Sequence, residues 1–166
     1  AAIDVECRDT NVHIIFSGRG VSIESKILRE QIPSQIRGRV HLLGDRSDVP
    51  MLMCAIDVMV SSSIGEGFPN VIGEAMATGV PCVATDVGDS AVIIGEEGVI
   101  TPSQDKNAIV AGIEKILKVS VEKRNVMRKK TRLRIVSNYT LDKAVQNYTT
   151  LYNNLYRNND IEYSDD

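Results

Sequence analysis

The sequence predicts an α/β fold, a Rossmann-like, doubly wound parallel sheet with helices on both faces. Three observations carry this prediction. Short apolar runs alternate with stretches of helical patterning, glycine and proline stand at most of the joins between them, and the pattern after Gly98 is helical. Such alternation is typical of parallel strands whose connections are covering helices.

The individual elements follow from these runs in order. Apolar runs of strand length predict strands at 12–16, 40–43, 56–60 and 80–84. Helical patterning between them predicts helices at 23–32, 49–54 and 70–78. Ligands of such sheets bind beyond the carboxyl ends of the strands, which is where Gly18, Gly44 and Glu66 are expected to lie.

Three helices are predicted in the last part of the chain. Asp105 can cap a helix that ends at Leu117, a second covers 121–136, and Thr140 can cap a third that reaches Tyr156. We expect these helices to close the domain. The second contains seven basic residues, for which a solvated helix face is preferred over a membrane or nucleic acid patch.

Length and composition predict one domain over 1–157, followed by a polar, acidic tail over 158–166. The chain has 166 residues, of which 43% are hydrophobic, enough for a single core. It contains no run of about 18 apolar residues and no signal peptide pattern, so we expect a cytoplasmic protein. A net charge of −3 argues against nucleic acid as a partner.

The cysteines and histidines do not predict a metal site. Cys7, Cys54 and Cys82 are widely and irregularly spaced, and the last two stand in apolar runs, which favours buried free thiols. His13 and His41 lie in strand-like stretches without the spacing of zinc ligands, which favours structural or surface roles.

The most informative segment is 63–81, which places two carboxylates around a turn that leads into a helix. Glu66 stands among Gly, Phe and Pro and is predicted in a loop, whereas Glu74 is predicted one turn inside a helix that stops near Gly79. Between them, the helix start would offer unpaired N–H groups and a partial positive charge to an anion. Carboxylates that flank a bound diphosphate can accept hydrogen bonds from sugar hydroxyls. The segment therefore predicts a sugar nucleotide site without a metal.

A simpler interpretation of the same residues is weighed beside this one. Glu74 could act only as a helix-dipole partner, while Gly67, Pro69 and Gly79 could be ordinary turn residues. Each is plausible alone, but the joint spacing favours a ligand site. For Gly18, Arg19 and Gly20 the simpler interpretation is at least as strong, because a glycine pair ends many strands.

Residues 63–81 resemble the glutamate-x7-glutamate signature of retaining, two-domain (GT-B) glycosyltransferases of the family 4 type, the group 1 glycosyl transferases. The resemblance continues upstream and downstream in the order of that family's C-terminal domain. It covers most of residues 12–157. The segments that carry it are 18–20, 40–44, 55–58, 83–89 and 98–102.

The resemblance implies a role for each matched position. Glu66 would be the catalytic residue, next to the donor sugar hydroxyls beside the reacting carbon, and Glu74 would bind the ribose hydroxyls. The backbone around the helix start would hold the sugar and the distal phosphate. Residues implied there are Gly67, Phe68, Pro69, Asn70 and Val71. Weaker matches that would line the phosphate and base regions are Gly18, Arg19, Gly20 and Gly44.

The implied activity is transfer of a sugar from a nucleoside diphosphate sugar to an acceptor hydroxyl with retention, with no cofactor or metal. The family's C-terminal domain normally opens with a further strand-helix unit that carries an Arg and a Lys, and no equivalent stands before Val12. The N-terminal acceptor domain is also expected to be missing. We therefore expect these residues alone to bind donor weakly and not to catalyse transfer. Polysaccharide synthesis and a peripheral contact at the inner face of the membrane are suggested by the family alone.

Three alternatives remain open. The full-length protein could be a sugar nucleotide epimerase or a phosphorylase of the same architecture. It could also be a non-catalytic nucleotide-sugar binding module. A dinucleotide-binding oxidoreductase is disfavoured, because no Gly-x-Gly-x-x-Gly follows the first predicted strand.

Overall fold

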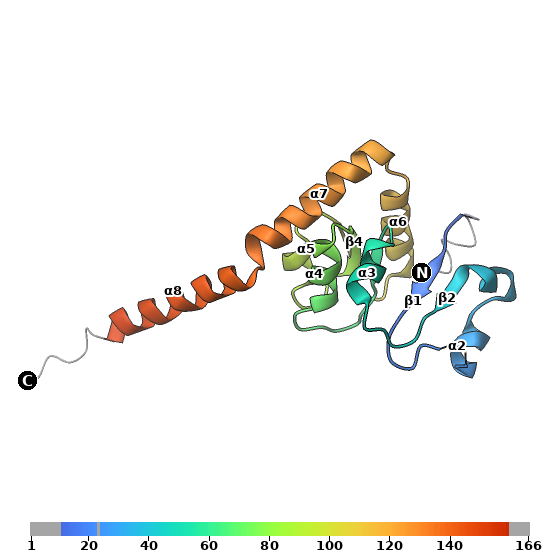
Figure 1. Ribbon diagram of the computed structural model, residues 1–166, viewed down its shortest axis with the longest axis horizontal. Helices are drawn as coiled ribbons and strands as arrows, with labels where there is room; N and C mark the ends of the chain where they lie inside the picture. Colours follow the sequence, from blue (N-terminus) through green and yellow to red (C-terminus); the bar gives the residue numbers. More distant parts are fainter. Residues whose placement is uncertain (1–10, 23, 160–166) are drawn as a thin grey trace, which may run out of the picture.

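The computed structural model describes residues 11–22 and 24–159 and has the predicted α/β architecture (Figure 1). The strands are β1 (Ile14–Phe16), β2 (Val40–Leu42), β3 (Met59–Ser61), β4 (Cys82–Thr85) and β5 (Val99–Thr101). The helices are α2 (Lys26–Gln31), the 3-10 helix η1 (Ser34–Arg39), α3 (Val49–Cys54), α4 (Asn70–Ala77), α5 (Ser90–Ile94), α6 (Lys106–Leu117), α7 (Val121–Asn138) and α8 (Leu141–Asn159). All strand pairs are parallel.

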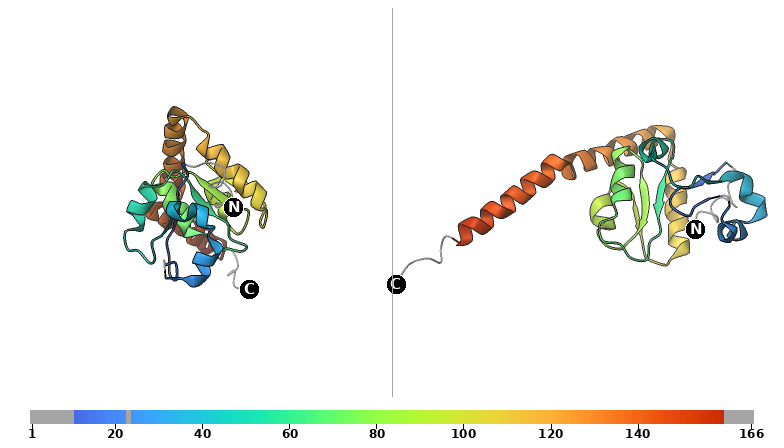
Figure 2. Two further views of the ribbon diagram at one scale, coloured as in Figure 1. Left: turned by 90° about the vertical axis from the view of Figure 1, so that its right-hand side faces the viewer. Right: turned by 60° about the horizontal axis from the view of Figure 1, so that its bottom comes forward.

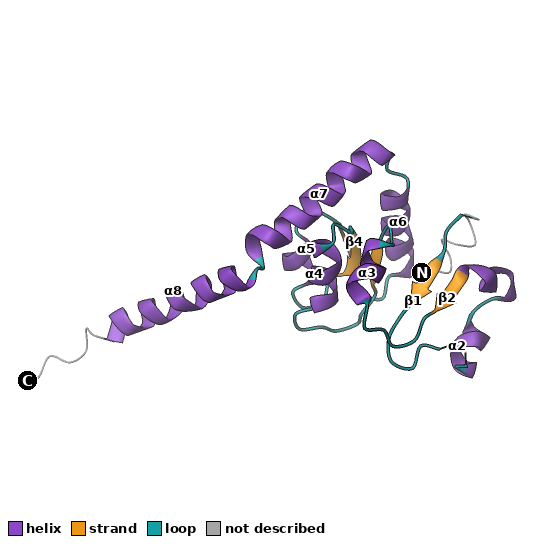
Figure 3. Cartoon of the chain, in the orientation of Figure 1, coloured by secondary structure: helices purple, strands orange, loops and turns teal. Residues whose placement is uncertain are grey.

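The parallel strands form two sheets in the described residues rather than one. β1 pairs with β2, and β4 lies between β3 and β5, while Figure 3 shows β1 and β2 standing apart from the other group. Side-chain packing rather than strand pairing connects the two groups. Val12, ahead of β1, packs with Val58 and Val60 against the apolar cluster around α6.

The core is built on both faces of β4, whose four residues are all buried. Because side chains alternate across a strand, Cys82 and Ala84 point into one cluster, with Ile72 and Ile93, while Val83 points into the other. Figure 2 shows α4 and α5 on one side of this sheet and α6 on the other. Burial on both faces explains why the segment is apolar without alternation.

Most predicted boundaries are confirmed to within one residue, although β1, β3 and β4 begin two or three residues later than predicted. Caps explain the starts of α6 and α8. The Asp105 side chain accepts the N–H of Ala108 at 2.9 Å at the start of α6, and Thr140 Oγ1 accepts the N–H of Lys143 at 3.2 Å at the start of α8. α2 begins later than predicted, at Lys26, because Ser25 is its N-cap. Three short elements were not predicted: η1, α5 and β5.

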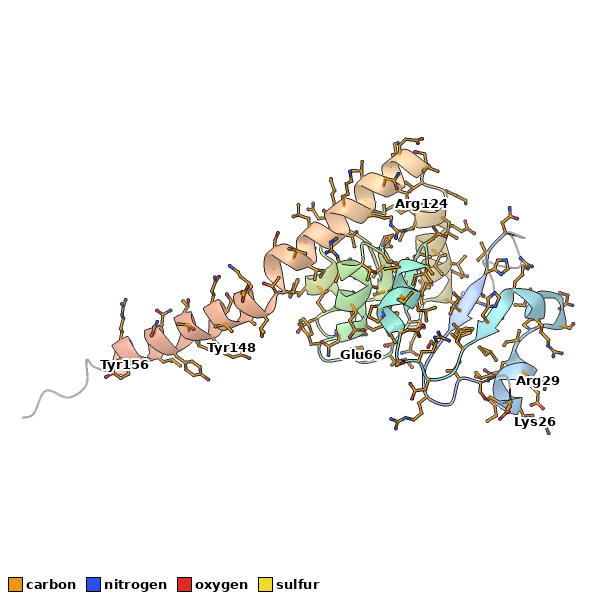
Figure 4. The ribbon with its side chains drawn as sticks, in the orientation of Figure 1. Lys26, Arg29, Glu66, Arg124, Tyr148 and Tyr156 are labelled. Atoms are coloured by element: carbon orange, nitrogen blue, oxygen red, sulfur yellow. The ribbon has the colours of Figure 1, made fainter. Side chains whose placement is uncertain are left out.

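The prediction that three helices close the domain is wrong for α8. α7 packs across α4, but α8 extends away from the body (Figures 1 and 2). Its apolar side chains are exposed along its length, including Leu141 at 80% and Tyr156 at 72% (Figure 4). α8 runs to Asn159, beyond the predicted start of the tail, and residues 160–166 lie outside the described part. No helix in the described ranges has the length and apolar character needed to cross a membrane.

The sequence predicted that the basic residues of α7 form a solvated face. Three of them instead bind the body of the protein. Arg124 donates to the Asp57 carboxylate at 3.1 Å, and Arg134 donates to the carbonyl of Ile93 at 2.7 Å. Arg132 donates to the carbonyl of Ala77. Such long side chains hold the helix against the body through hydrogen bonds to backbone oxygens.

The cysteine prediction is half right. Cys82 is a buried free thiol, but Cys54 is exposed, because it is the last residue of α3 and faces away from the core that its neighbour Met53 enters. Cys7 lies outside the described residues. His13 and His41 are exposed and their ring nitrogens lie 3.0 Å apart, which confirms the predicted surface role.

Candidate functional site

The two carboxylates of the motif lie on different elements, as predicted. Glu66 belongs to the loop between β3 and α4, and Glu74 lies on α4, one turn beyond its first residue, Asn70. Both side chains are exposed. Along the chain, the two acids therefore lie before and after the first residues of α4, and Glu66 lies in the loop that follows the carboxyl end of β3 (Figure 4).

The start of α4 has no side-chain cap. Its N-cap is Pro69, which makes no side-chain cap hydrogen bond. The Pro69 carbonyl accepts the N–H of Ile72 at 3.1 Å, which sets the first turn. The first N–H groups of a helix have no partner within the helix and carry part of the positive end of its dipole. This helix start can therefore receive an anion.

The Glu66 carboxylate is held by its own loop. The hydroxyl of Ser63 donates to Glu66 Oε1 at 2.7 Å. The carbonyl of Ser63 in turn accepts the Thr85 hydroxyl at 2.6 Å, so the loop is tied to the end of β4. Neither bond was predicted, because a serine near a glutamate is no signal by itself and Thr85 lies 22 positions from Ser63.

A second contact comes from the turn after β4. The N–H of Asp89 donates to the carbonyl of Gly67 at 2.9 Å. Gly88 has φ +52°, and a Cβ at this position would overlap the carbonyl oxygens of Glu66 and Gly67. Only glycine allows so close an approach with this backbone conformation. The segment from Thr85 to Asp89 thus contacts the backbone of the Glu66 loop and holds it in place.

The Phe68 side chain contacts another part of the protein. Its ring is half exposed, at 51%, and lies 6.1 Å from the ring of Tyr139, measured between centroids. Tyr139 is the C-cap of α7 and donates its hydroxyl to the carbonyl of Val92 at 3.0 Å. Part of the Phe68 ring is therefore engaged by Tyr139, and the role of its backbone in donor binding stays a prediction.

The glycine loops after β1 and β2 meet each other. The N–H of Gly18 donates to the carbonyl of Gly44 at 2.8 Å, and the Ser17 hydroxyl donates to the same oxygen at 3.0 Å. Arg19 and Gly20 are exposed. Figure 1 shows these loops on the same lower side of the molecule as the loop between β3 and α4. The structure thus joins the two glycine loops by hydrogen bonds and places the Glu66 loop on the same side of the molecule, and their joint role in one site stays a prediction.

The charges at this edge are mainly acidic. Glu66, Glu74, Asp86 and Asp89 are all exposed. Across the described ranges, no group of three or more His, Cys, Asp or Glu side chains is arranged to hold a metal ion. The arrangement suits hydroxyl donors beside an anion that the helix start receives.

Residues 1–119 match the family described as "Glycosyl transferases group 1". This match covers most of the chain, including the loop, α4 and the turn after β4. The chain belongs to this family. It is 29% identical over 140 residues to the Escherichia coli UDP-Gal:alpha-D-GlcNAc-diphosphoundecaprenol alpha-1,3-galactosyltransferase, covering 83% of this chain and 36% of that protein.

Two further relatives agree with this family. The Bacillus anthracis N-acetyl-alpha-D-glucosaminyl L-malate synthase is 32% identical over 124 residues, covering 74% of this chain and 32% of that protein. The Rhizobium meliloti lipopolysaccharide core biosynthesis mannosyltransferase LpsB is 35% identical over 98 residues, covering 57% of this chain and 28% of that protein. The chain thus spans about a third of the length of these relatives.

Solved structures show the same fold. Anabaena Alr3699/HepE in complex with UDP superposes with a TM-score of 0.79 at 25% identity, covering 92% of this chain and 44% of that one. The Rickettsia africae glycosyltransferase also superposes with a TM-score of 0.79, at 17% identity, covering 95% of this chain and 43% of that one. This group 1 glycosyltransferase chain therefore has the fold of the C-terminal domain of a GT-B protein.

Proposed function

We propose that this chain binds a nucleoside diphosphate sugar at the start of α4. We further propose that the full-length protein transfers the sugar to an acceptor hydroxyl with retention of anomeric configuration. One observation carries the proposal: the uncapped start of α4 lies between two exposed carboxylates, Glu66 and Glu74. Membership of a family whose relatives are named glycosyltransferases supports it.

The helix start supplies the diphosphate site. The N–H groups of Asn70 and Val71 are the first of α4, and the helix dipole adds about half a positive charge. Glu74 accepts hydrogen bonds from the ribose hydroxyls, and Glu66 accepts them from the sugar beside its reacting carbon. The helix dipole takes the place of a metal ion in this proposal, so we expect activity to persist in EDTA.

The chemistry follows from these positions. The bond between the anomeric carbon and the diphosphate oxygen breaks as the acceptor oxygen bonds to that carbon, and the acceptor proton passes to the leaving diphosphate. Positive charge develops at the anomeric carbon, near the Glu66 carboxylate, and negative charge develops on the leaving diphosphate, at the start of α4. Preorganised groups at both places stabilise the transition state more than the ground state. The acceptor and its activation are assigned to a part of the protein outside this chain.

UDP is the first nucleotide to test. The relative with 83% coverage of this chain is named for UDP-Gal, and the superposed Anabaena protein was solved with UDP. A GDP donor remains the alternative, because base selection depends on loop shape. The test is calorimetric titration with UDP, GDP and their sugar conjugates, on this chain and on the full-length protein.

Three variants separate the roles. We expect Glu74→Ala to weaken binding of the bare nucleotide and Glu66→Ala to weaken only the sugar conjugate. Glu96→Ala is the matched control, because Glu96 is also an exposed acid but precedes β5, at the opposite edge of the same parallel sheet. If Glu96→Ala weakens binding as much as Glu74→Ala, the donor does not bind at α4.

Product analysis on the full-length protein tests the reaction itself. Proton NMR of the first product formed should show the anomeric configuration of the donor. An isomerised sugar nucleotide would indicate an epimerase, and a free sugar phosphate would indicate a phosphorylase. Tight binding without any turnover would indicate a non-catalytic binding module.

A further inference from the structure

We propose that Thr85 is a positioning residue of the donor site, which acts through the backbone of Ser63 on the carboxylate of Glu66. This proposal rests on the proposed function, because it requires that Glu66 contacts the donor sugar. The juxtaposition comes from two neighbouring strands: Thr85 ends β4, and the Ser63 loop follows β3.

Thr85 is a rigid anchor. Its side chain is 1% exposed, and β4 pairs with β3 on one side and β5 on the other. Ala84, its neighbour, is opposite Ser61 at the end of β3, and Thr85 is opposite Thr101 of β5. The backbone at this position cannot move without disturbing a paired strand, and close packing around the buried side chain restricts its rotation.

The anchor reaches Glu66 in two steps. Thr85 Oγ1 donates to the carbonyl of Ser63 at 2.6 Å, and Ser63 Oγ donates to Glu66 Oε1 at 2.7 Å. The first bond places the Ser63 backbone, and the second orients the carboxylate. The protein engages one carboxylate oxygen of this exposed side chain, which leaves the lone pairs of the other available to a sugar hydroxyl.

Glu66 needs this support more than most acids. It is exposed, and its neighbours on both sides are Gly65 and Gly67, neither of which restrains the backbone. A flexible glutamate on a flexible loop would lose conformational entropy each time a donor binds. Holding it in advance removes that loss and keeps the carboxylate beside the reacting carbon.

The turn after β4 braces the same loop at a second point. Asp89 donates its N–H to the Gly67 carbonyl at 2.9 Å. Because a trans peptide is planar, with C=O and N–H opposed, this bond points the N–H of Phe68 away from the turn. Gly88 lets the turn approach this closely. The segment 85–89 therefore sets both the Glu66 carboxylate and the adjacent backbone amide.

The test uses the full-length protein and compares two buried threonines. Thr85→Val removes the hydroxyl while keeping the shape of the side chain. Thr101→Val makes the same change on the neighbouring strand, where Thr101 is 4% exposed and its hydroxyl donates to the Ala84 carbonyl at 3.3 Å rather than to the Glu66 loop. Thr85→Ser restores the hydroxyl. The donor is whichever of UDP-glucose, UDP-galactose and GDP-mannose has the highest kcat/KM with the unmodified protein.

We expect Thr85→Val to lower kcat/KM for the donor about tenfold while the inhibition constant of the bare nucleotide stays within about twofold. Thr85→Ser and Thr101→Val should remain within about twofold of the unmodified protein. The proposal is overturned if Thr101→Val loses as much as Thr85→Val, if the bare nucleotide weakens equally, or if Thr85→Val has no effect. Should Thr85→Val not fold, Ser63→Ala removes the second step at a half-buried loop position and carries the same expectation.

Hydrogen exchange separates this proposal from the proposed function. Without any ligand, exchange of the amides over 63–70 should rise in Thr85→Val and not in Thr101→Val. Unchanged exchange in Thr85→Val overturns the positioning role whatever the donor is. Increased exchange in a protein that binds none of the three donors supports the anchor and places the failure in the proposed function.

Discussion

The ring of Phe68 lies 6.1 Å from the ring of Tyr139, at an interplanar angle of 56°. Phe68 belongs to the loop before α4, and Tyr139 stands where α7 ends and the chain turns into α8. The contact links the candidate donor loop to the junction from which α8 extends. Tyr139 is itself held by its hydroxyl bond to the Val92 carbonyl.

A double-mutant cycle measures this link. Tilted aromatic pairs at this separation contribute about 0.5–1.5 kcal/mol beyond their area burial. We expect Phe68→Leu and Tyr139→Leu to show a coupling of that size in urea unfolding. The control cycle pairs Phe68→Leu with Tyr156→Leu, because Tyr156 is 72% exposed on α8. Equal coupling in both cycles would contradict the contact.

Arg124 should matter more through its backbone contacts than through its ion pair. Its Nη2 donates to the carbonyl of Leu117 at 2.9 Å, whereas its partner Asp57 is 60% exposed. Exposed ion pairs contribute at most about 1 kcal/mol, but a hydrogen bond that involves a charged group contributes about 1.5–3 kcal/mol, and the Leu117 bond is part-buried. Arg124→Met should therefore lower the free energy of unfolding clearly more than Asp57→Asn. Equal losses would show that the ion pair dominates.

The buried thiol of Cys82 predicts a dependence of stability on alkaline pH. Burial raises the pKa of the Cys82 thiol from its ordinary value of 9.0 to about 12. The unfolded chain then loses this proton above pH ~9 while the folded chain keeps it, so the stability from the neutral thiol is complete below ~9 and is lost as pH rises toward ~12.

Comparison with Cys82→Ala isolates this effect. The difference in free energy of unfolding between the unmodified protein and the variant should shrink by about 1.4 kcal/mol per pH unit above ~9. Urea unfolding at pH 7, 8, 9 and 10 measures it, since all other groups titrate equally in both proteins. A difference that stays constant through pH 10 would mean that the thiol is not held neutral by burial.

The cap of α6 predicts a loss of stability at an exposed position. Asp105 accepts the N–H of Ala108 at 2.9 Å. Replacing such a cap by alanine costs about 0.5–2 kcal/mol. Asp105→Ala should lower the free energy of unfolding by that amount, and Asp105→Asn, which keeps the acceptor, should recover most of it. Asp142→Ala, in the first turn of exposed α8, is the control that removes the same charge without removing this bond.

Several features could be predicted from the sequence because their signals are local. The alternation of apolar runs predicted four of the strands, since residues close in sequence alternate or repeat with the period of their element. Asp105 and Thr140 marked helix starts because a cap bonds only a few residues ahead. The segment 63–81 placed Glu66 in a loop and Glu74 on a helix, because turn residues and a helix start act over a few positions. In each case the residue and its partner are neighbours in the chain.

Other features required the tertiary structure. β5 was missed because its three residues, Val99–Thr101, become a strand by pairing with β4 rather than by their own pattern. Cys54 stands in an apolar run but ends α3 on its outer side, and the periodicity of a short helix does not settle that. The exposed face of α8 looks in the sequence like any helix that packs on a core, because amphipathic patterning shows which face is apolar but not what covers it.

The contacts that support the candidate donor site are also among the features that required the tertiary structure. The sequence by itself determined that two carboxylates flank a helix start, because the spacing of residues along one segment carries that information. The same spacing also determined the family. Only the tertiary structure decided that Thr85 and Gly88 hold the Glu66 loop, since these contacts span two strands and 22 positions. A single threonine at the end of a buried strand has no local signal, and its role arises from which backbone carbonyl the fold brings within hydrogen-bonding distance of its hydroxyl.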